Sequence, residues 1–417
     1  MILLKQVRVL DPVSQTDKIA DVLLEESKIK AIETNLTDVS QNAKTINAEG
    51  MVLGPGLVDL YSHSGEPGHE ERETIVSLTA AAVAGGFTRL NILPDTLPII
   101  DNNTSAQGVL EQKKLWPDSS PQLNFWGALT QGLEGKQMTE ISELANIVIG
   151  FADGYPVENL NLLLRLLEYV KPLGKPVALV PKNSQFSANG VVREGITSIG
   201  FGLPGTPTIS EAAAIAVLLE LTSATETPIH LMRVSTRRGV ELIADAKARG
   251  VPVTASTTWM HLLLNAESVI SYDPSLYLDP PLGLKSDMLA LIQGVKTGVI
   301  DAIAIDHSPY TYEEKKVAFG ETPPGAIGLE LALPLLWNRF VATGEWSALE
   351  LWYRLSVAPL LCLQQKPITC VAGKFAELVL FDPQKIWKVN HNNLKSLSTN
   401  TPWFDQEITG KVLRIWN

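Results

Sequence analysis

The sequence has few of the residues that characterise secreted, membrane or nucleic-acid-binding proteins. Its 417 residues include two cysteines, Cys362 and Cys370, which lie in apolar surroundings and provide no disulfide framework. No uncharged apolar run reaches the length of a membrane span, and residues 1–8 lack the pattern of a signal peptide. With 34 basic against 45 acidic residues, the net charge of −11 argues against a nucleic-acid partner. We expect a cytoplasmic protein that binds neither nucleic acid nor membranes.

What the sequence does contain is a long alternation of strand-like and helix-like segments. Apolar runs typical of buried strands span residues 57–63, 87–95, 123–129, 147–153, 176–182, 228–235, 252–258 and 301–307. Helical patterns, with apolar residues three and four apart, cover residues 73–85, 157–169, 210–225, 238–249 and 286–297. Eight such units over about 250 residues are typical of a (β/α)8 barrel. A doubly wound open sheet is the alternative, but no Gly-rich nucleotide loop follows the first strand.

Both ends of the chain have a different character, with short runs in which apolar and polar residues alternate. The runs cover residues 2–4, 5–10, 19–24, 28–32, 376–383 and 410–416. Neither end is long enough to form a good core alone, so we expect them to pair in one half-exposed antiparallel unit. The predicted fold class is α/β: a TIM-like (β/α)8 barrel over residues 53–364, with a small β-sandwich domain built from residues 1–52 and 365–417.

The most informative stretch covers residues 54–68, at the end of the first predicted barrel strand. A Gly-Pro-Gly turn leads into it, and polar and glycine residues follow it. Asp59, Tyr61 and His63 are spaced by two and are expected to project to one face. The glutamates between residues 66 and 73 open a helix, where the helix dipole favours carboxylates.

This stretch resembles the first barrel strand of the amidohydrolase superfamily, and most closely that of the dihydroorotases. In that family the strand reads Asp-x-His-x-His and is followed by Arg and Glu-Pro-Gly. Further matches lie in order along the chain, at residues 93–96, 151–154, 202–205, 234–236, 279–282, 301–309, 328–330 and 400–403. The resemblance runs nearly end to end and implies the barrel and sandwich of the amidohydrolases.

The resemblance also implies a cyclic amide hydrolase in which one or two zinc ions activate a water molecule. The metal-ligand positions of the family fall here on Tyr61, His63, Asp153, Val180, Arg233 and Asp306. His63, Asp153 and Asp306 are the residual metal ligands, because imidazole and carboxylate groups can bind zinc.

The other three positions have lost their metal-binding chemistry. Tyr61 is a poor ligand at neutral pH, Val180 has no lone pair, and Arg233 brings a positive charge where a cation would sit. A two-zinc centre is therefore not expected. Asp306, the general base of the family, is then vestigial, because it has no metal-activated water to deprotonate. Lys182 lies two residues beyond a lost ligand and is not assigned a role.

The substrate positions implied by the resemblance are altered as well. The Arg and Asn positions that bind the carboxylate of dihydroorotate are Gly65, Asp95 and Asp279 here, and a His after the last strand is Tyr310. One cation is lost and two neutral amides have become acids. We expect this mouth to repel an anionic substrate, since like charge is added and a bidentate clamp is missing.

Carboxylates at the barrel mouth need compensation once a metal is absent. Asp153 and Asp306 form this cluster, with Asp59 as a third candidate. The planar guanidinium of Arg233 can bridge two carboxylates, so we predict that it replaces the zinc and pairs with Asp306 or Asp153. The alternative is that Arg233 is a solvated loop residue.

Two functions stay open. The first is a non-catalytic pseudoenzyme without a cofactor, resembling the inactive dihydroorotase-like homologues that hold aspartate transcarbamoylase in a larger complex. The second is a metal-dependent cyclic amidohydrolase, a dihydroorotase or an enzyme of altered substrate, with one zinc on His63, Asp153 and Asp306. The first places the chain in pyrimidine biosynthesis, and an oligomer is expected.

Overall fold

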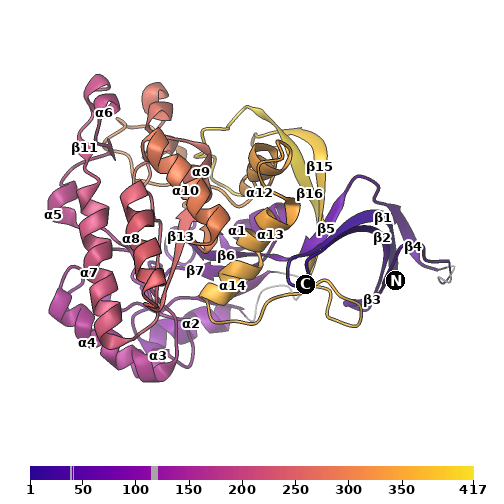
Figure 1. The fold of residues 1–417 in the computed structure, drawn as a ribbon, viewed down its shortest axis with the longest axis horizontal. Coiled ribbons are helices and arrows are strands. Elements are labelled where there is room, and N and C mark those ends of the chain that lie inside the picture. The colour runs from indigo at the N-terminus through magenta and orange to yellow at the C-terminus, as the bar shows by residue number, and fades with distance from the viewer. Residues whose placement is uncertain (38–39, 41, 114–120) are drawn as a thin grey trace.

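Parallel strands form the centre of the larger unit in the computed structural model, which describes residues 1–37, 40, 42–113 and 121–417 (Figure 1). One set comprises β6 (Leu57–Ser62), β7 (Phe87–Ile92) and β8 (Gln122–Phe125). The other comprises β9 (Val177–Leu179), β12 (Ile229–Leu231), β13 (Val253–Thr258) and β14 (Ala302–Ala304). Neighbouring strands within each set are parallel, as the predicted barrel requires.

Two narrow contacts close these sets into a ring. Phe151 forms parallel bridges to Gly127 after β8 and to Val177 in β9. On the opposite side, the His63 amide donates to the His307 carbonyl at 2.8 Å. The predicted (β/α)8 barrel is thus confirmed, but the strand expected at residues 147–153 is reduced to one bridging residue. Its first residues belong to a turn instead, because the amides of residues 147 and 148 both donate to the Leu144 carbonyl.

The outer layer consists of helices that connect the strands (Figure 1). Those in the predicted positions are α1 (Ile75–Gly85), α4 (Leu160–Val170), α7 (Ile209–Thr225), α8 (Arg237–Ala248) and α10 (Lys285–Thr297). Others are α2 (Asn103–Lys113), α3 (Ile141–Leu144), α9 (Trp259–Leu263), α12 (Ala332–Leu336), α13 (Ala348–Leu355) and α14 (Val357–Cys362). The helix ends follow local sequence: Thr74 and Thr236 cap the starts of α1 and α8, and Gly86 ends α1 with φ of 88°.

The smaller unit is a β-sandwich that both chain ends build, as predicted (Figure 1). Its strands are β1 (Ile2–Asp11), β2 (Thr16–Glu25), β3 (Lys28–Glu33), β4 (Lys44–Asn47), β5 (Val52–Pro55), β15 (Leu378–Lys388) and β16 (Glu407–Trp416). Apolar residues from both ends share one buried core, which includes Val9, Val22, Leu53 and Leu380. The core explains the pairing, because each end alone buries too little apolar surface.

The expectation of a purely antiparallel unit is wrong. β1 pairs antiparallel with β2, but it pairs in parallel with β4 and with β5. After the β1–β2–β3 meander the chain crosses back, and it then runs along the other side of β1 in the same direction. The domain boundaries at residues 52 and 365 stay predictions.

Specific contacts join the sandwich to the barrel. The Arg89 guanidinium of β7 binds both carboxylate oxygens of Glu377, which precedes β15, at 2.8 Å each. The Trp352 indole of α13 donates to the Pro55 carbonyl at the end of β5 at 2.8 Å. Because bidentate and buried hydrogen bonds fix orientation, these contacts hold the two units in one arrangement.

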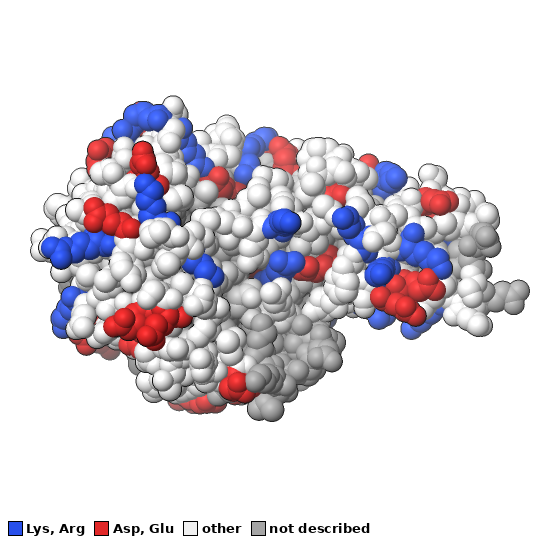
Figure 2. Space-filling model, turned by 90° about the horizontal axis from the view of Figure 1, so that it is seen from below, with Lys and Arg blue, Asp and Glu red and all other residues white. Residues whose placement is uncertain are grey.

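The surface carries both signs of charge. Figure 2 shows one face on which Lys and Arg side chains are interspersed with Asp and Glu, over the barrel and over the sandwich. In the described part of the chain, no helix combines the length and the apolar character that crossing a membrane requires.

Gly85 tests the packing of α1 against the barrel. A Cβ at Gly85 would collide with the Leu329 carbonyl, so Gly85→Ala should lower the free energy of unfolding by about 1–3 kcal/mol. The control is Gly108→Ala in α2, where a Cβ meets nothing within 4 Å and should stabilise the helix by about 0.5–1 kcal/mol. Urea unfolding measures both, and equal effects would contradict the packing.

Candidate functional site

A cavity of about 160 Å³ lies at the carboxyl ends of the barrel strands. Its lining includes several of the residues predicted from the sequence: His63, Val180, Arg233, Asp279, Asp306 and Tyr310. The other predicted site residues, Tyr61, Gly65, Asp95 and Asp153, lie outside this lining.

The centre of the cavity floor is an ion pair between Arg233 and Asp306. Arg233 Nε and Nη2 donate to the two carboxylate oxygens of Asp306 at 2.8 and 2.6 Å. Arg233 Nη1 donates to the Gly154 carbonyl at 3.0 Å, and Nη2 also lies 3.2 Å from His63 Nε2. The predicted pairing of Arg233 with Asp306 is confirmed, and the alternative of a solvated loop residue is wrong because Arg233 is buried.

Backbone conformation places the two partners. Arg233 follows β12 with φ of 53°, and Asp306 follows β14 with φ of 54°, both in the left-handed region. Non-glycine residues adopt this region at an energetic cost, so the paired side chains help to hold both strand ends in it. Burial lowers the pKa of Arg233, but the Asp306 carboxylate raises it by more, so the guanidinium stays charged.

His63 joins this centre to a second carboxylate. Its Nδ1 lies 2.6 Å from Asp95 Oδ2. Burial lowers the pKa of His63, while the charge and hydrogen bond of Asp95 raise it by more. Conversely, burial raises the pKa of Asp95, and His63 brings the net shift below the usual value. The imidazole therefore holds Asp95 ionised and lies between the two carboxylates of Asp95 and Asp306.

Tyr61 supports the centre from within the barrel. Its hydroxyl lies 2.8 Å from Ser256 Oγ and accepts from the Arg233 amide at 3.0 Å. The Arg233 guanidinium carbon lies 5.6 Å from the centre of the Tyr61 ring, within the range of a cation–π contact. Burial raises the pKa of Tyr61, which keeps the phenol neutral.

Asp59 does not share the face of Tyr61 and His63, so that expectation is wrong. The pairing register of β6 with β7 shifts between Asp59 and Ser62. The Asp59 carboxylate accepts from the Ile305 amide at 2.8 Å and from the Ser62 hydroxyl. Burial raises its pKa to about 7.

Asp153 binds donors other than Arg233, so it does not share this cation with Asp306, whereas Asp59, the third candidate, does interact with Asp306 through its charge. The Asp153 carboxylate accepts from the amides of Leu129 and Thr130 at 2.7 and 3.0 Å, and from the Thr130 hydroxyl at 2.6 Å. These donors satisfy both oxygens, because the loop after β8 approaches closely. Only the carbonyl of the next residue, Gly154, reaches Arg233.

The expected repulsion of anions by an acidic mouth stays a prediction, but the two acids at the altered substrate positions each have a basic partner. Asp95 pairs with His63, and Asp279 pairs with Lys182 at 2.8 Å. Sequence reasoning missed Lys182. Its signal was a basic residue just past the end of β9 together with an acid, Asp279, at an altered substrate position.

Gly65 and Tyr310 stand at the two remaining positions where the resemblance implies substrate-binding Arg and His. At Gly65 a Cβ would collide with the main-chain carbonyls of Glu73 and His69, so no side chain fits where the family has Arg. The ring of Tyr310 lies between two cations, with the Arg72 guanidinium and the Lys315 ammonium each 5.1 Å from its centre.

A catalytic zinc does not fit these side chains. The Arg233 guanidinium stands between Asp306 and His63, and its charge would repel a metal ion there. Asp153 is occupied by other donors. Across the described residues, no group of three or more His, Cys, Asp and Glu side chains is arranged to hold a metal ion.

Comparisons with known proteins agree with this geometry. A family model described as Dihydro-orotase-like matches residues 50–239. A probable dihydroorotase-like protein of Synechocystis sp. is 44% identical over 98% of each chain. The protein belongs to the dihydroorotase-like family. Dihydroorotases of Pelobacter propionicus and Syntrophus aciditrophicus are 37% and 36% identical over 99% of this chain and 97% and 96% of their own lengths.

Solved structures support the fold of this dihydroorotase-like protein. The L-hydantoinase (dihydropyrimidinase) of Arthrobacter aurescens superposes with a TM-score of 0.84 at 22% identity, covering 99% of this chain and 94% of its own. A D-hydantoinase superposes with a TM-score of 0.81 at 19% identity, over 99% and 94%. The likeness confirms the fold of a barrel with a β-sandwich.

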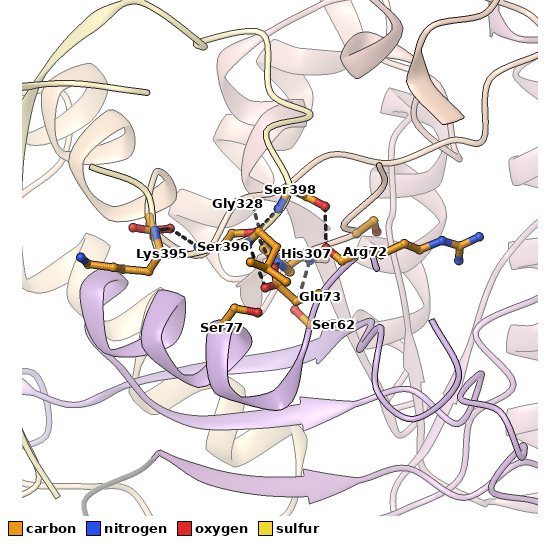
Figure 3. Close-up of polar contacts among 12 residues, drawn as sticks. Ser62, Arg72, Glu73, Ser77, His307, Gly328, Lys395, Ser396 and Ser398 are labelled. Carbon is orange, nitrogen blue, oxygen red and sulfur yellow. Dashed lines mark hydrogen bonds and ion pairs between the residues drawn. The ribbon is translucent and has the colours of Figure 1, made fainter. Parts of the chain in front are cut away.

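A second buried polar cluster in this dihydroorotase-like chain connects the barrel to the segment before β16 (Figure 3). Glu73 accepts from the Leu397 amide at 3.1 Å, contacts the Ser396 hydroxyl, and lies 3.3 Å from His307 Nε2. His307 Nδ1 accepts from the Gly328 amide at 3.1 Å, which leaves the Nε2 proton for Glu73. Glu73 therefore binds distant segments as well as Ser77 in the first turn of α1, and its helix-dipole interpretation stays a prediction.

Glu330 extends this cluster. One of its oxygens accepts from the amides of Lys395 and Ser396 at 2.8 and 3.1 Å. Burial, together with the charge of Glu73, raises the pKa of Glu330 to about 7 against the lowering effect of these donors. The carboxyl group therefore changes charge near neutral pH.

The Arg233–Asp306 pair gives a double-mutant test. Arg233→Met should lower the free energy of unfolding by about 3–5 kcal/mol, because the Asp306 carboxylate then stays largely buried without its cation. Arg233→Met with Asp306→Asn should cost less than the two single changes summed, by about 0.5–3 kcal/mol. Lys136→Met, in an exposed pair with Glu134, is the control and should change stability by less than about 1 kcal/mol. Strict additivity in urea unfolding would contradict the coupling.

Glu330 gives a pH test. Its folded pKa near 7 exceeds the unfolded value, so the contribution of Glu330 to stability falls as pH rises from about 5 to 8. Burial lowers the pKa values of His230 and His261, and these two groups act in the opposite direction below about pH 6, so the decline from Glu330 is clearest above pH 6. Burial also raises the pKa of Asp59 to about 7, so this carboxyl group changes stability in the same direction as Glu330. Glu330→Gln should flatten the decline without abolishing it, whereas Glu49→Gln at the surface should not change it. Thermal unfolding from pH 5 to 8 measures this, and an unchanged slope in Glu330→Gln would refute it.

Proposed function

We propose that this protein is a non-catalytic member of the dihydroorotase-like family that acts as a protein scaffold in pyrimidine biosynthesis. The observation that carries the proposal is the Arg233 guanidinium, bound to both oxygens of Asp306. A general base needs a free lone pair within reach of the attacking water. Here the lone pairs that would accept that proton are engaged by a permanent cation.

The chemistry of the remaining mouth supports the same proposal. Hydrolysis of a cyclic amide needs an activated water and polarisation of the carbonyl, which zinc supplies in metal-dependent hydrolases. Val180 presents only an apolar surface, and His63 is held between Asp95 and Arg233. The 44% identity to a protein named dihydroorotase-like exceeds the 36–37% to the two dihydroorotases above.

The partner we propose is aspartate transcarbamoylase, in the cytoplasm and in an oligomeric complex. The proposal rests on the resemblance to inactive family members that assemble with that enzyme. A barrel whose mouth is held by internal ion pairs stays folded without a metal, and a scaffold needs this property. No cofactor is required for such a role.

A second candidate is a metal-dependent cyclic amidohydrolase with one zinc. It is favoured by the 36–37% identity to dihydroorotases and by the 160 Å³ cavity at the barrel mouth. This function would require Arg233 to leave Asp306 so that His63, Asp153 and Asp306 could turn toward one ion.

Metal content and turnover separate the two functions. Purified protein, supplied with zinc during expression, should contain far less than one zinc per chain by mass spectrometry and should not hydrolyse dihydroorotate above the uncatalysed rate. The protein should co-elute with aspartate transcarbamoylase of the same organism. Its addition should also raise the activity of that enzyme. Stoichiometric zinc with turnover would sink the scaffold proposal.

Restoring the lost ligands sharpens this test. Tyr61→His, Val180→His and Arg233→His together should raise zinc binding above the wild-type level, because the cation is removed and imidazoles are supplied. The control places three histidines on separate exposed helices, through Tyr169→His, Val76→His and Arg238→His. Equal zinc uptake by both variants would show that the mouth is not special.

A further inference from the structure

Two short helical turns near the barrel mouth expose large apolar side chains. On α6 (Ile196–Gly200), Ile196 and Ile199 are 91% and 82% exposed. On η3 (Ala266–Ser271), Ile270 is 68% exposed. We call the set Ile196, Ile199, Phe201, Ile270 and Tyr272 the apolar rim. Isolated exposed apolar residues are common, but several on adjoining turns mark an interaction site.

The two turns adjoin through their last residues. Phe201 ends α6 and Tyr272 ends η3, and their ring centres lie 5.9 Å apart in an edge-on contact. The Tyr272 hydroxyl donates to the Phe201 carbonyl at 2.7 Å. Both turns belong to loops that leave the carboxyl ends of barrel strands, β9 and β13, and α6 stands at the upper left of Figure 1.

The isoleucines of the rim do not hold these turns together. The Gly195 amide at the start of α6 donates to Ser198 Oγ at 3.1 Å, and the Asn265 side chain caps η3 by accepting from the Glu267 amide at 2.8 Å. Polar contacts thus fix the backbone, while the isoleucines project into solvent.

The two segments that carry the rim have charged residues of one sign, and the buried Lys315 reaches one of them from another loop, where it donates to the Pro274 carbonyl at 3.3 Å. Residues 194–206 and 265–276 contain Glu194, Glu267 and Asp273, and neither segment contains Lys or Arg. Glu194 and Glu267 are exposed. A second copy of this chain would place carboxylates opposite carboxylates, which opposes self-association through this surface.

From this apolar centre and its acidic border, we propose that the apolar rim is a docking surface for a partner protein that presents apolar side chains flanked by Lys or Arg. The partner's apolar groups cover the isoleucines, and its cations face Glu194 and Glu267. The inference does not depend on the fate of the metal site. A catalytic or a non-catalytic barrel would carry the same surface.

Two synthetic amphipathic helical peptides test whether the rim prefers a basic partner. Both have leucines at the same positions, but one has Lys and the other Glu at its polar positions. Fluorescence anisotropy on the full chain should show binding of the Lys peptide and weakening by added salt. The variant Ile196→Ser, Ile199→Ser and Ile270→Ser should lose at least about tenfold in affinity. The control variant Val76→Ser and Ile386→Ser removes apolar side chains 74% and 64% exposed elsewhere and should bind as the wild type does.

Three results would overturn the proposal. One is equal affinity of the rim variant and the wild type for the Lys peptide. Another is binding of the Glu peptide as tight as that of the Lys peptide. The third is a wild-type dimer in sedimentation velocity that the rim variant abolishes, because the occupant would then be a second copy. Thermal unfolding of all variants confirms that they are folded, since the changed residues are exposed.

Discussion

The bidentate ion pair between Arg233 and Asp306 is the interaction on which the barrel mouth depends. It connects the ends of β12 and β14, and it holds two residues in the left-handed backbone region. Because Asp306 is mostly shielded from water, removing the cation would leave a carboxylate that cannot be solvated well. A protein side chain therefore supplies the positive charge that balances this carboxylate at the barrel mouth.

The same compensation extends across the mouth. His63 faces Asp95, and Lys182 faces Asp279, so each substituted acid has a cation from another strand end. Charge balance of this kind stabilises a closed arrangement but leaves few free groups for chemistry. The polar groups at the mouth of this barrel are therefore paired with one another. The apolar rim lies apart from them, on two short outer turns.

Much of the fold could be predicted, because apolar periodicity reports which face of an element is buried. The helices and the order of the barrel strands follow from that pattern. The strand expected at residues 147–153 could not be predicted correctly, since its apolar residues fit a turn after α3 equally well. The parallel pairing of β1 with β4 and β5 also escaped prediction, because alternation does not encode strand direction.

The sequence by itself indicated the family frame, the presence of Val180 and Arg233 at positions where the resemblance implies metal ligands, and the pairing of Arg233 with an acid. Only the tertiary structure decided which acid. Asp153 is satisfied by donors of a loop 23 residues away, and Lys182 meets an acid 97 residues away. A carboxylate binds the donors that the fold brings within hydrogen-bond distance, and that choice depends on loop paths that residue identity does not specify.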